Sequence, residues 1–228
     1  MSTTAQPFYA GEPNLLNPDN HALVLIDHQP SQVAAIGSHD RTQVINNVAG
    51  LAKVAKIFGV PTLLTTVVED LGGKLLQQIQ NVFPDQEPIN RTTLNSWEDP
   101  RVVDWVRQTG RNKVVIAGLW TEICVAFAAL SALGDGYEVY VVTDASGGAT
   151  TEAHERAVQR MIQAGVVPLT WVAYGSELQR DWARTEHLAE IQQLMVEHGG
   201  VMGSNAAWEV QLLGTPTPEW VLQRVPLG

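Results

Sequence analysis

The stretch that decides the fold runs from Lys113 to Leu130 and reads KVVIAGLWTEICVAFAAL. It begins with a short apolar, β-branched run, passes through Gly118, and continues as an alanine-rich segment without proline. An apolar run ended by a glycine is typical of a buried parallel strand, and an alanine-rich segment favours a helix. The stretch therefore predicts a strand followed by a helix, with the single cysteine, Cys124, near the first turn of that helix.

Cys124 is a candidate nucleophile because of this position. The first turn of a helix has backbone N–H groups without intrahelical partners and lies at the positive end of the helix dipole. Such a turn stabilises a thiolate and can bind a nearby oxyanion. A lone cysteine can equally be a small buried apolar residue, and its position alone leaves both interpretations open.

The composition is that of a globular protein with one large domain. The chain has 228 residues, of which 45% are apolar and 17% charged. A net charge of -10 argues against a nucleic-acid or anionic-membrane partner, because no basic surplus is present to meet phosphates. One cysteine excludes an internal disulfide and a multi-thiolate metal site. We expect a cytoplasmic protein, since no apolar run approaches the ~20 residues of a membrane span and no signal peptide is recognisable.

Strands and helices alternate along the chain, with glycine turns before several strands. This order predicts an α/β fold with right-handed crossovers: a doubly wound, Rossmann-like, six-stranded parallel sheet of order 3-2-1-4-5-6, with helices on both faces. The predicted strands are His21–Asp27, Val60–Val68, Ile89–Thr92, the run that opens at Lys113, Glu138–Ala145 and Val166–Trp171.

Three regions are predicted along the chain. Residues 1–20, rich in Pro, Asn and Gly, predict an irregular N-terminal arm; residues 21–198 form the domain; residues 199–228 are a C-terminal tail with little pattern. Within the domain, Ser176 to His198 predicts one long amphipathic helix. The aromatic residues of the arm, this helix and seven tryptophans together predict a homo-oligomer, because a single sheet can bury only some of them.

The predicted strand order brings separate residues to one crevice. The switch point of such a sheet lies between strands one and four, whose carboxyl ends flank the ligand site. Asp27 ends strand one and Cys124 follows strand four, so the acid can act as the base that activates the thiol. Arg91, in the short third strand, supplies a cation beside them. The alternative for Asp27 is a loop acid that caps the next element.

Several motifs carry a resemblance to a known family. GLWTEICVAFAALSAL resembles the G-x-x-T-D/E-x-C-V signature of the isochorismatase-like cysteine hydrolases, and Asp27 in ALVLIDHQ matches the acid of that family's first strand. RTTLNSWED, VYVVTDASG and WVAYGSELQRDW resemble the YcaC-like branch, so the likeness covers roughly residues 20–198. The resemblance is specific, since separated motifs agree in order and spacing.

The resemblance implies a catalytic triad of Asp27 as base, Cys124 as nucleophile and Arg91 in place of the family's usual lysine. It also implies a non-proline cis peptide bond between Trp120 and Thr121. Arginine cannot transfer a proton at neutral pH, so the role of Arg91 is expected to be electrostatic.

The chemistry that the family implies is attack of the Cys124 thiolate on an amide or similar acyl carbon. The backbone N–H groups of Thr121 and Cys124 would form the oxyanion hole. Asp27 would pass a proton to the leaving amine and then activate water against the thioester. Three further residues are expected to bind the substrate, although tryptophans are often core residues or subunit contacts: Asn95, Trp97 and Trp120.

No metal or other cofactor is expected. Nicotinamidases of this superfamily carry an Asp-x-His plus His metal site, and the matching stretch here, Thr66 to Gly73, has no histidine. The expected partners are a small-molecule substrate and further copies of the chain; the resemblance implies a ring-like assembly such as an octamer. Two alternatives stay open: a vinyl-ether hydrolase of the isochorismatase type, whose true members lack the cysteine, and a catalytically silent binding or assembly module.

Overall fold

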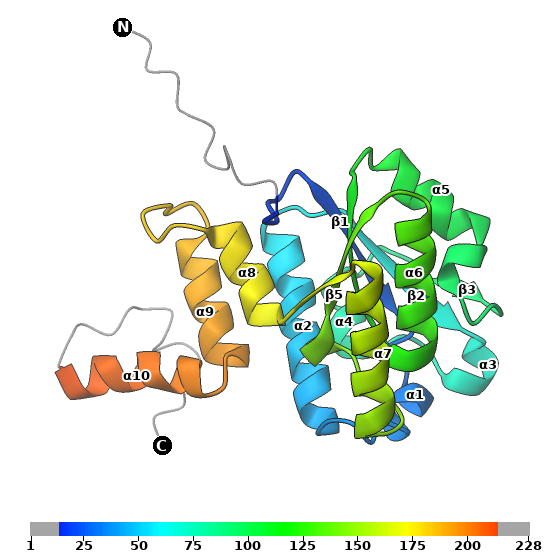
Figure 1. Cartoon of the computed structure of the whole chain (residues 1–228). Helices are drawn as coiled ribbons and strands as arrows, with labels where there is room; N and C mark the ends of the chain where they lie inside the picture. Colours follow the sequence, from blue (N-terminus) through cyan, green and yellow to red (C-terminus); the bar gives the residue numbers. More distant parts are fainter. Residues whose placement is uncertain (1–13, 214–228) are drawn as a thin grey trace, which may run out of the picture.

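The computed structural model describes residues 14–213, which form one parallel sheet between two layers of helices (Figure 1). The sheet order is β3-β2-β1-β4-β5-β6, and every neighbouring pair is parallel. This confirms the predicted doubly wound fold and its strand order. The strands are β1 (His21–Ile26), β2 (Thr62–Val67), β3 (Ile89–Arg91), β4 (Lys113–Gly118), β5 (Glu138–Val142) and β6 (Val167–Leu169).

The helices follow the strands as crossovers, and a turn of π-helix, η2 (Thr121–Val125), lies between β4 and the helix after it. Among residues 14–213, no helix combines the length and the apolar character needed to cross a bilayer. The helices are α1 (Pro30–Ala34), α2 (Arg41–Ile57), α3 (Glu69–Gly72), α4 (Gln77–Gln80), α5 (Pro100–Gln108), α6 (Ala126–Gly134), α7 (Thr151–Ala164), α8 (Trp171–Gln179), α9 (Leu188–His198) and α10 (Val201–Leu213). Two 3-10 turns, η1 (Ser96–Glu98) and η3 (Thr143–Ala145), complete the elements.

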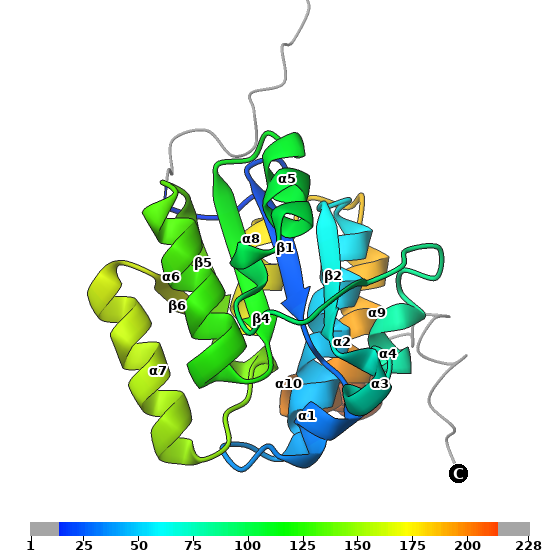
Figure 2. The same ribbon diagram turned by 90° about the vertical axis from the view of Figure 1, so that its right-hand side faces the viewer.

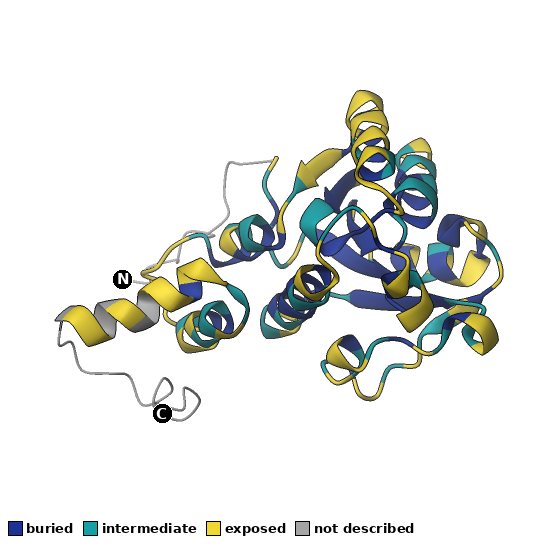
Figure 3. Ribbon diagram, turned by 90° about the horizontal axis from the view of Figure 1, so that it is seen from below, coloured by how far each residue is buried: buried dark blue, intermediate teal, exposed yellow. Residues whose placement is uncertain are grey.

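The sheet is buried on both faces because successive residues of each strand point to opposite sides. In β1, Leu23 and Leu25 pack into a core shared with α2, α8 and α9. Val24 and Ile26 pack into a second core, shared with α5, α6 and α7. Figure 2 shows the two helix layers on either side of the strands, and Figure 3 shows the buried residues gathered between them. The near-continuous apolar strands are therefore explained by cover on both faces.

The prediction of one long helix over Ser176–His198 is wrong. The chain forms α8 and α9 instead, with a break at Arg180, whose φ is +59°. The Gln179 side chain donates from Nε2 to the carbonyl oxygens of Asp181 and Arg184, which fixes the connection between the helices. Apolar residues continue at helical spacing on both sides of the break, so the pattern alone does not reveal it.

The predicted C-terminal tail, residues 199–228, is helical over its first part. It contains α10, which packs against α9 and lies away from the sheet (Figure 1). The remainder of the tail, residues 214–228, lies outside the described residues.

The predicted arm, residues 1–20, is described only from residue 14 onward, and this part contains no helix or strand. Its Leu16 side chain is fully buried, and the Leu16 N–H donates to the Glu177 carboxylate at 2.7 Å. The end of the arm is therefore fastened to α8. Phe8 and Tyr9 lie outside the described residues.

Gly118 offers a test of the close approach between β4 and β1. A Cβ atom at this position would lie 2.6 Å from the Ile26 carbonyl oxygen and 2.7 Å from Ile26 Cβ. Gly118→Ala is therefore expected to lower the free energy of unfolding by about 1–3 kcal/mol, measured by urea denaturation. Gly134→Ala is the matched control, because a Cβ there meets no atom within 4 Å. Equal midpoints for the two variants would contradict the close approach.

Candidate active site

Asp27 is placed by the bend with which the chain leaves β1. Its φ is +56°, a left-handed conformation that Asp adopts more readily than most residues. The Asp27 N–H donates to the Thr65 carbonyl oxygen at 3.1 Å, and the Gln29 N–H donates to the Asp27 carbonyl oxygen at 2.8 Å. These backbone bonds fix the bend, so the carboxylate is held at the carboxyl end of the central strand.

The Asp27 carboxylate brings the predicted residues together. Oδ2 accepts a hydrogen bond from Arg91 Nη2 at 2.6 Å, and Oδ1 accepts one from Thr65 Oγ1 at 3.0 Å. The Cys124 thiol also hydrogen-bonds with this carboxylate. Thr65 was not predicted as a site residue; it is placed here by the register of β1 and β2, in which it lies opposite Ile26.

Arg91 reaches the site from the edge strand β3. Its side chain is almost fully buried, and Nη1 donates to the Thr93 carbonyl oxygen while Nη2 binds Asp27. Two separate donors of one guanidinium are therefore used, which a lysine could not reproduce from the same position.

Cys124 lies in the π-helical turn and is 5% exposed. Burial raises the pKa of Cys124 to about 12; the Asp27 charge contributes to the rise, while the Arg91 charge and the Trp120 N–H oppose it. The expected stabilisation of a thiolate is therefore wrong for the resting site, since burial and a nearby carboxylate outweigh the donors of the turn. Cys124 is a thiol at neutral pH.

The environment also strengthens Asp27 as a base. Burial raises the pKa of Asp27, and the Arg91 charge and the hydrogen bonds from Thr65 and Cys124 oppose this rise. A carboxylate of raised pKa accepts a proton more readily. The pair of a neutral thiol and a stronger base suits proton transfer during nucleophilic attack rather than before it.

The backbone before Cys124 differs from the prediction in two ways. The cis peptide bond joins Leu119 and Trp120, one residue before the predicted Trp120–Thr121 bond. Leu119 still extends β4, as its N–H donates to the Ile26 carbonyl oxygen at 3.0 Å. The Thr121 N–H donates to the Gly147 carbonyl oxygen at 2.9 Å, so it is already engaged. The expected role of Thr121 as an oxyanion donor is therefore corrected.

Thr121 instead connects the π-helical turn η2 to α7. Its Oγ1 lies 2.8 Å from His154 Nδ1, and the His39 ring packs edge-on against His154 with centroids 4.6 Å apart. Glu122 Oε1 accepts a hydrogen bond from the Ala149 N–H at 2.9 Å. The segment that carries Cys124 is thus held by a helix and a loop far along the chain. His154 lies in no motif, so its contact with this turn could not be predicted from the sequence.

The predicted substrate-binding residues separate into two places. Asn95 Nδ2 donates to Ser131 Oγ at 3.0 Å, and Trp97 Nε1 donates to the Asp135 carboxylate at 2.9 Å. Asn95 and Trp97 therefore hold η1 against the C-terminal half of α6, the half away from Cys124. Trp120 contacts Cys124 through its backbone N–H, and Trp97 belongs to the same buried apolar cluster as Cys124.

Trp120 also connects the site to α1. Its indole Nε1 donates to the Gln32 carbonyl oxygen at 2.9 Å, and its side chain is partly buried against an apolar cluster that includes Val33 and Ile36. This contact fixes the ring beside the turn that carries Cys124. Trp120 thus remains a candidate wall of the substrate site.

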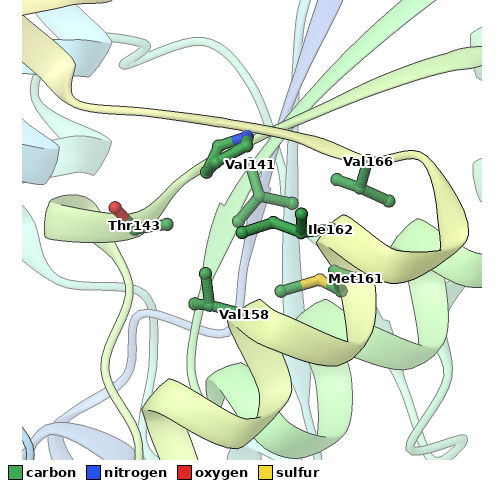
Figure 4. A pocket seen from close by; sticks show the side chains of 7 residues that line it. Val141, Thr143, Val158, Met161, Ile162 and Val166 are labelled. Atoms are coloured by element: carbon green, nitrogen blue, oxygen red, sulfur yellow. The ribbon is translucent and has the colours of Figure 1, made fainter.

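Two other features do not add chemistry to this site. Within residues 14–213, no group of three or more His, Cys, Asp and Glu side chains is arranged to hold a metal ion. A small pocket between β5, β6 and α7 is lined almost entirely by apolar side chains (Figure 4). It contains neither a nucleophilic thiol nor an acid or base, and none of the predicted site residues. Its lining is Val141, Thr143, Val158, Met161, Ile162, Val166 and Pro168.

Comparisons with known proteins agree with the fold. Residues 21–173 match the family model of the isochorismatase domain, so the chain belongs to the isochorismatase family. Within the family it belongs to the YcaC-like branch: it is 36% identical to the probable hydrolase YcaC of Escherichia coli over 194 residues, which cover 80% of this chain and 93% of that protein.

Two solved structures support the same branch. The Escherichia coli YcaC structure, an octameric hydrolase of unknown specificity, matches with a TM-score of 0.82 and 34% identity over 91% of this chain and 100% of that chain. The Pseudomonas aeruginosa YcaC structure, with hexane-2,5-diol and covalent acrylamide, matches with a TM-score of 0.83 and 33% identity over 90% of this chain and 100% of that chain.

The raised pKa of Cys124 predicts slow alkylation at neutral pH. The thiolate is the reacting form, so a pKa of about 12 implies a rate constant with iodoacetamide that keeps rising about tenfold per pH unit beyond pH 9.5. An ordinary thiol, of pKa about 8.5, levels off near there. The measurement is the mass shift of the folded protein with time at several pH values. The chain unfolded in urea is the control, and a folded protein that reacts as fast as this control at pH 7 would refute the assignment.

Proposed function

We propose that this protein is a cysteine hydrolase that cleaves a small amide or related acyl substrate through a thioester, without a metal. The observation that carries the proposal is the buried contact of one carboxylate, Asp27, with both the Cys124 thiol and the Arg91 guanidinium. A nucleophile hydrogen-bonded to a base, with the base oriented by a third group, is the general arrangement of covalent catalysis.

In the first step, Cys124 Sγ bonds the acyl carbon while Asp27 accepts the thiol proton. The backbone N–H group of Cys124 stabilises the tetrahedral oxyanion, joined by that of Trp120 once attack ends its hydrogen bond to Cys124 Sγ, so that Trp120 takes the role first expected of Thr121. Asp27 then donates the proton to the leaving amine as the carbon–nitrogen bond breaks. The amine departs, and the acyl group stays on Cys124 as a thioester.

In the second step, water adds to the thioester carbonyl carbon and Asp27 accepts a proton from it. The carbon–sulfur bond breaks, and Sγ recovers the proton from Asp27. The acid product leaves and the resting thiol is restored. Arg91 contributes its positive charge in both steps and transfers no proton.

The relatives support this chemistry. Escherichia coli YcaC is a hydrolase of unknown specificity, and Pseudomonas aeruginosa YcaC carries covalent acrylamide. Acrylamide is an electrophile toward thiolates, so its covalent capture by a relative supports a nucleophile in this chain as well. The alternative is a binding or assembly protein without catalysis, and the resting thiol form of Cys124 favours it.

Substitutions of Cys124 and Asp27 separate these two functions. Cys124→Ala should abolish ammonia release from a small-amide substrate found by screening, and Asp27→Asn should lower it by at least about 100-fold. The double variant should be scarcely worse than either single variant, because the two residues act as one unit. Asp27→Asn also leaves Arg91 buried without its counter-charge, so circular dichroism must first show a folded variant. Turnover retained by Cys124→Ala would mean that the nucleophile is misassigned.

We also propose that the protein is a homo-oligomer. Escherichia coli YcaC, all of which this chain covers, is octameric. In this chain, α10 leaves large apolar side chains exposed: Val201 is 74% exposed and Leu212 82%. Apolar side chains gathered on a helix that packs away from the sheet support contact with another subunit.

The oligomer has a direct test. Light scattering at micromolar concentration should give a mass of two or more times 24.8 kDa. Replacing both Val201 and Leu212 by Ser should shift the distribution toward smaller species, because it removes apolar area from α10. The matched control is Leu94→Ser, an exposed apolar residue outside α10. A wild-type mass of one chain would contradict the proposal.

A further inference from the structure

One donor of the Arg91 guanidinium is unused. Nη2 binds Asp27 and Nη1 binds the Thr93 carbonyl oxygen, but Nε has no hydrogen-bond partner among the described residues. The Arg91 residue is 4% exposed, so this donor is also shielded from bulk solvent. A buried donor without an acceptor costs about 1–3 kcal/mol. Native proteins keep few such groups, and each needs a reason.

The position of this donor is set by the shape of the guanidinium group. The Nε–H and one Nη2–H point in parallel from the same edge of the planar fork. Nη2 binds Asp27 Oδ2 and Nε is the other donor on that edge, so an oxygen that accepts from Nε lies on the edge of the guanidinium that also carries the Asp27 donor. An ionised carboxylate offers about four acceptor positions, and Thr65, Arg91 and Cys124 use three. One position on Asp27 is therefore left for a further donor.

The unused Nε donor of Arg91 and the unused acceptor position of Asp27 together determine which ligand fits between them. A carbonyl or carboxylate oxygen at Nε would face the Asp27 carboxylate with no hydrogen between them, and the two oxygens would repel. A water molecule accepts from Nε with its oxygen and donates a hydrogen to Asp27, so it satisfies both. We infer that Arg91 is a positioning residue that holds the hydrolytic water against Asp27 in the second step; this rests on the proposed thioester mechanism.

The step balances with water as the only co-reactant. The water oxygen bonds the thioester carbonyl carbon, and its proton passes to Asp27. The carbon–sulfur bond breaks with its electron pair going to Cys124 Sγ, which takes the proton back from Asp27. Arg91 neither gains nor loses a proton.

The inference predicts which step depends on Arg91 more strongly. Acylation needs Cys124 and Asp27, whereas deacylation also needs water held at Nε. Loss of the Nε donor should therefore slow deacylation more than acylation. If Arg91 only keeps Asp27 in place, replacing Arg91 would slow both steps by the same factor.

The experiment uses p-nitrophenyl acetate on the full-length protein. The initial burst of nitrophenolate gives the acylation rate, the steady rate gives deacylation, and intact mass shows acetyl-Cys124. Arg91→Lys keeps the positive charge but carries all its donors on one nitrogen, so it does not replace the Nε donor. The rate of deacylation should therefore fall at least about 100-fold and the rate of acylation about tenfold or less. Acetyl-enzyme should then accumulate to nearly one group per chain.

The matched control is Thr65→Val, which removes the Oδ1 donor of Asp27 and leaves Arg91 intact. It should slow both steps by similar factors, so the ratio of the two rates stays near that of the wild type. Hydroxylamine attacks a thioester without help from a base, so it should restore acetyl release from Arg91→Lys.

The outcomes separate the inference from the proposed function. A wild-type ratio of rates in Arg91→Lys would overturn the role of Arg91 and leave the thioester mechanism standing. No acetylation of Cys124 in either the wild type or Arg91→Lys would overturn the mechanism itself. If Arg91→Lys is unfolded by circular dichroism, Arg91→Gln takes its place with the same expectation for the ratio, and an unchanged ratio there overturns the inference.

Discussion

The buried ion pair between Asp27 and Arg91 is the interaction on which the site and one edge of the sheet both depend. Removing two charges from water costs several kcal/mol per ion, which is offset only when further hydrogen bonds complete the group. Here Thr65 and Cys124 also hydrogen-bond the carboxylate, and the Thr93 carbonyl binds the guanidinium. β3 pairs in the sheet with β2 alone, so the side chain of Arg91 gives this short strand a second attachment, to the end of β1.

The same ion pair determines the resting state of the nucleophile. A carboxylate and a guanidinium in contact are nearly neutral together, so they do not compensate for the burial of a thiolate, and Cys124 keeps its proton. Proton transfer to Asp27 becomes favourable when Sγ bonds an acyl carbon, because the sulfur then carries no charge. The reactivity of the site is therefore coupled to the presence of a substrate.

The fold could be predicted because buried parallel strands are apolar along their whole length and glycine turns separate them. The proximity of Asp27, Arg91 and Cys124 could be predicted as well, because the strand order fixes which strand ends are neighbours. Contacts that depend on register or on loop geometry could not be predicted. Thr65 joins the site by its pairing with β1, and the Thr121 N–H is taken by a carbonyl of a distant loop. The break after α8 could not be predicted, because apolar residues continue at helical spacing past it and the positive φ is adopted by Arg180 rather than by a glycine.

The protonated state of Cys124 also bears on oxidation. Peroxides oxidise thiolates far faster than thiols, and oxidation as far as sulfinic or sulfonic acid removes the nucleophile for good. In the folded protein the sulfur is buried and protonated, so the single cysteine is protected while the site is at rest. An unfolded or nascent chain exposes the same sulfur with an ordinary pKa. Oxidative damage should therefore fall mainly on chains that have not completed the sheet, and a chain once folded keeps its nucleophile through its own packing.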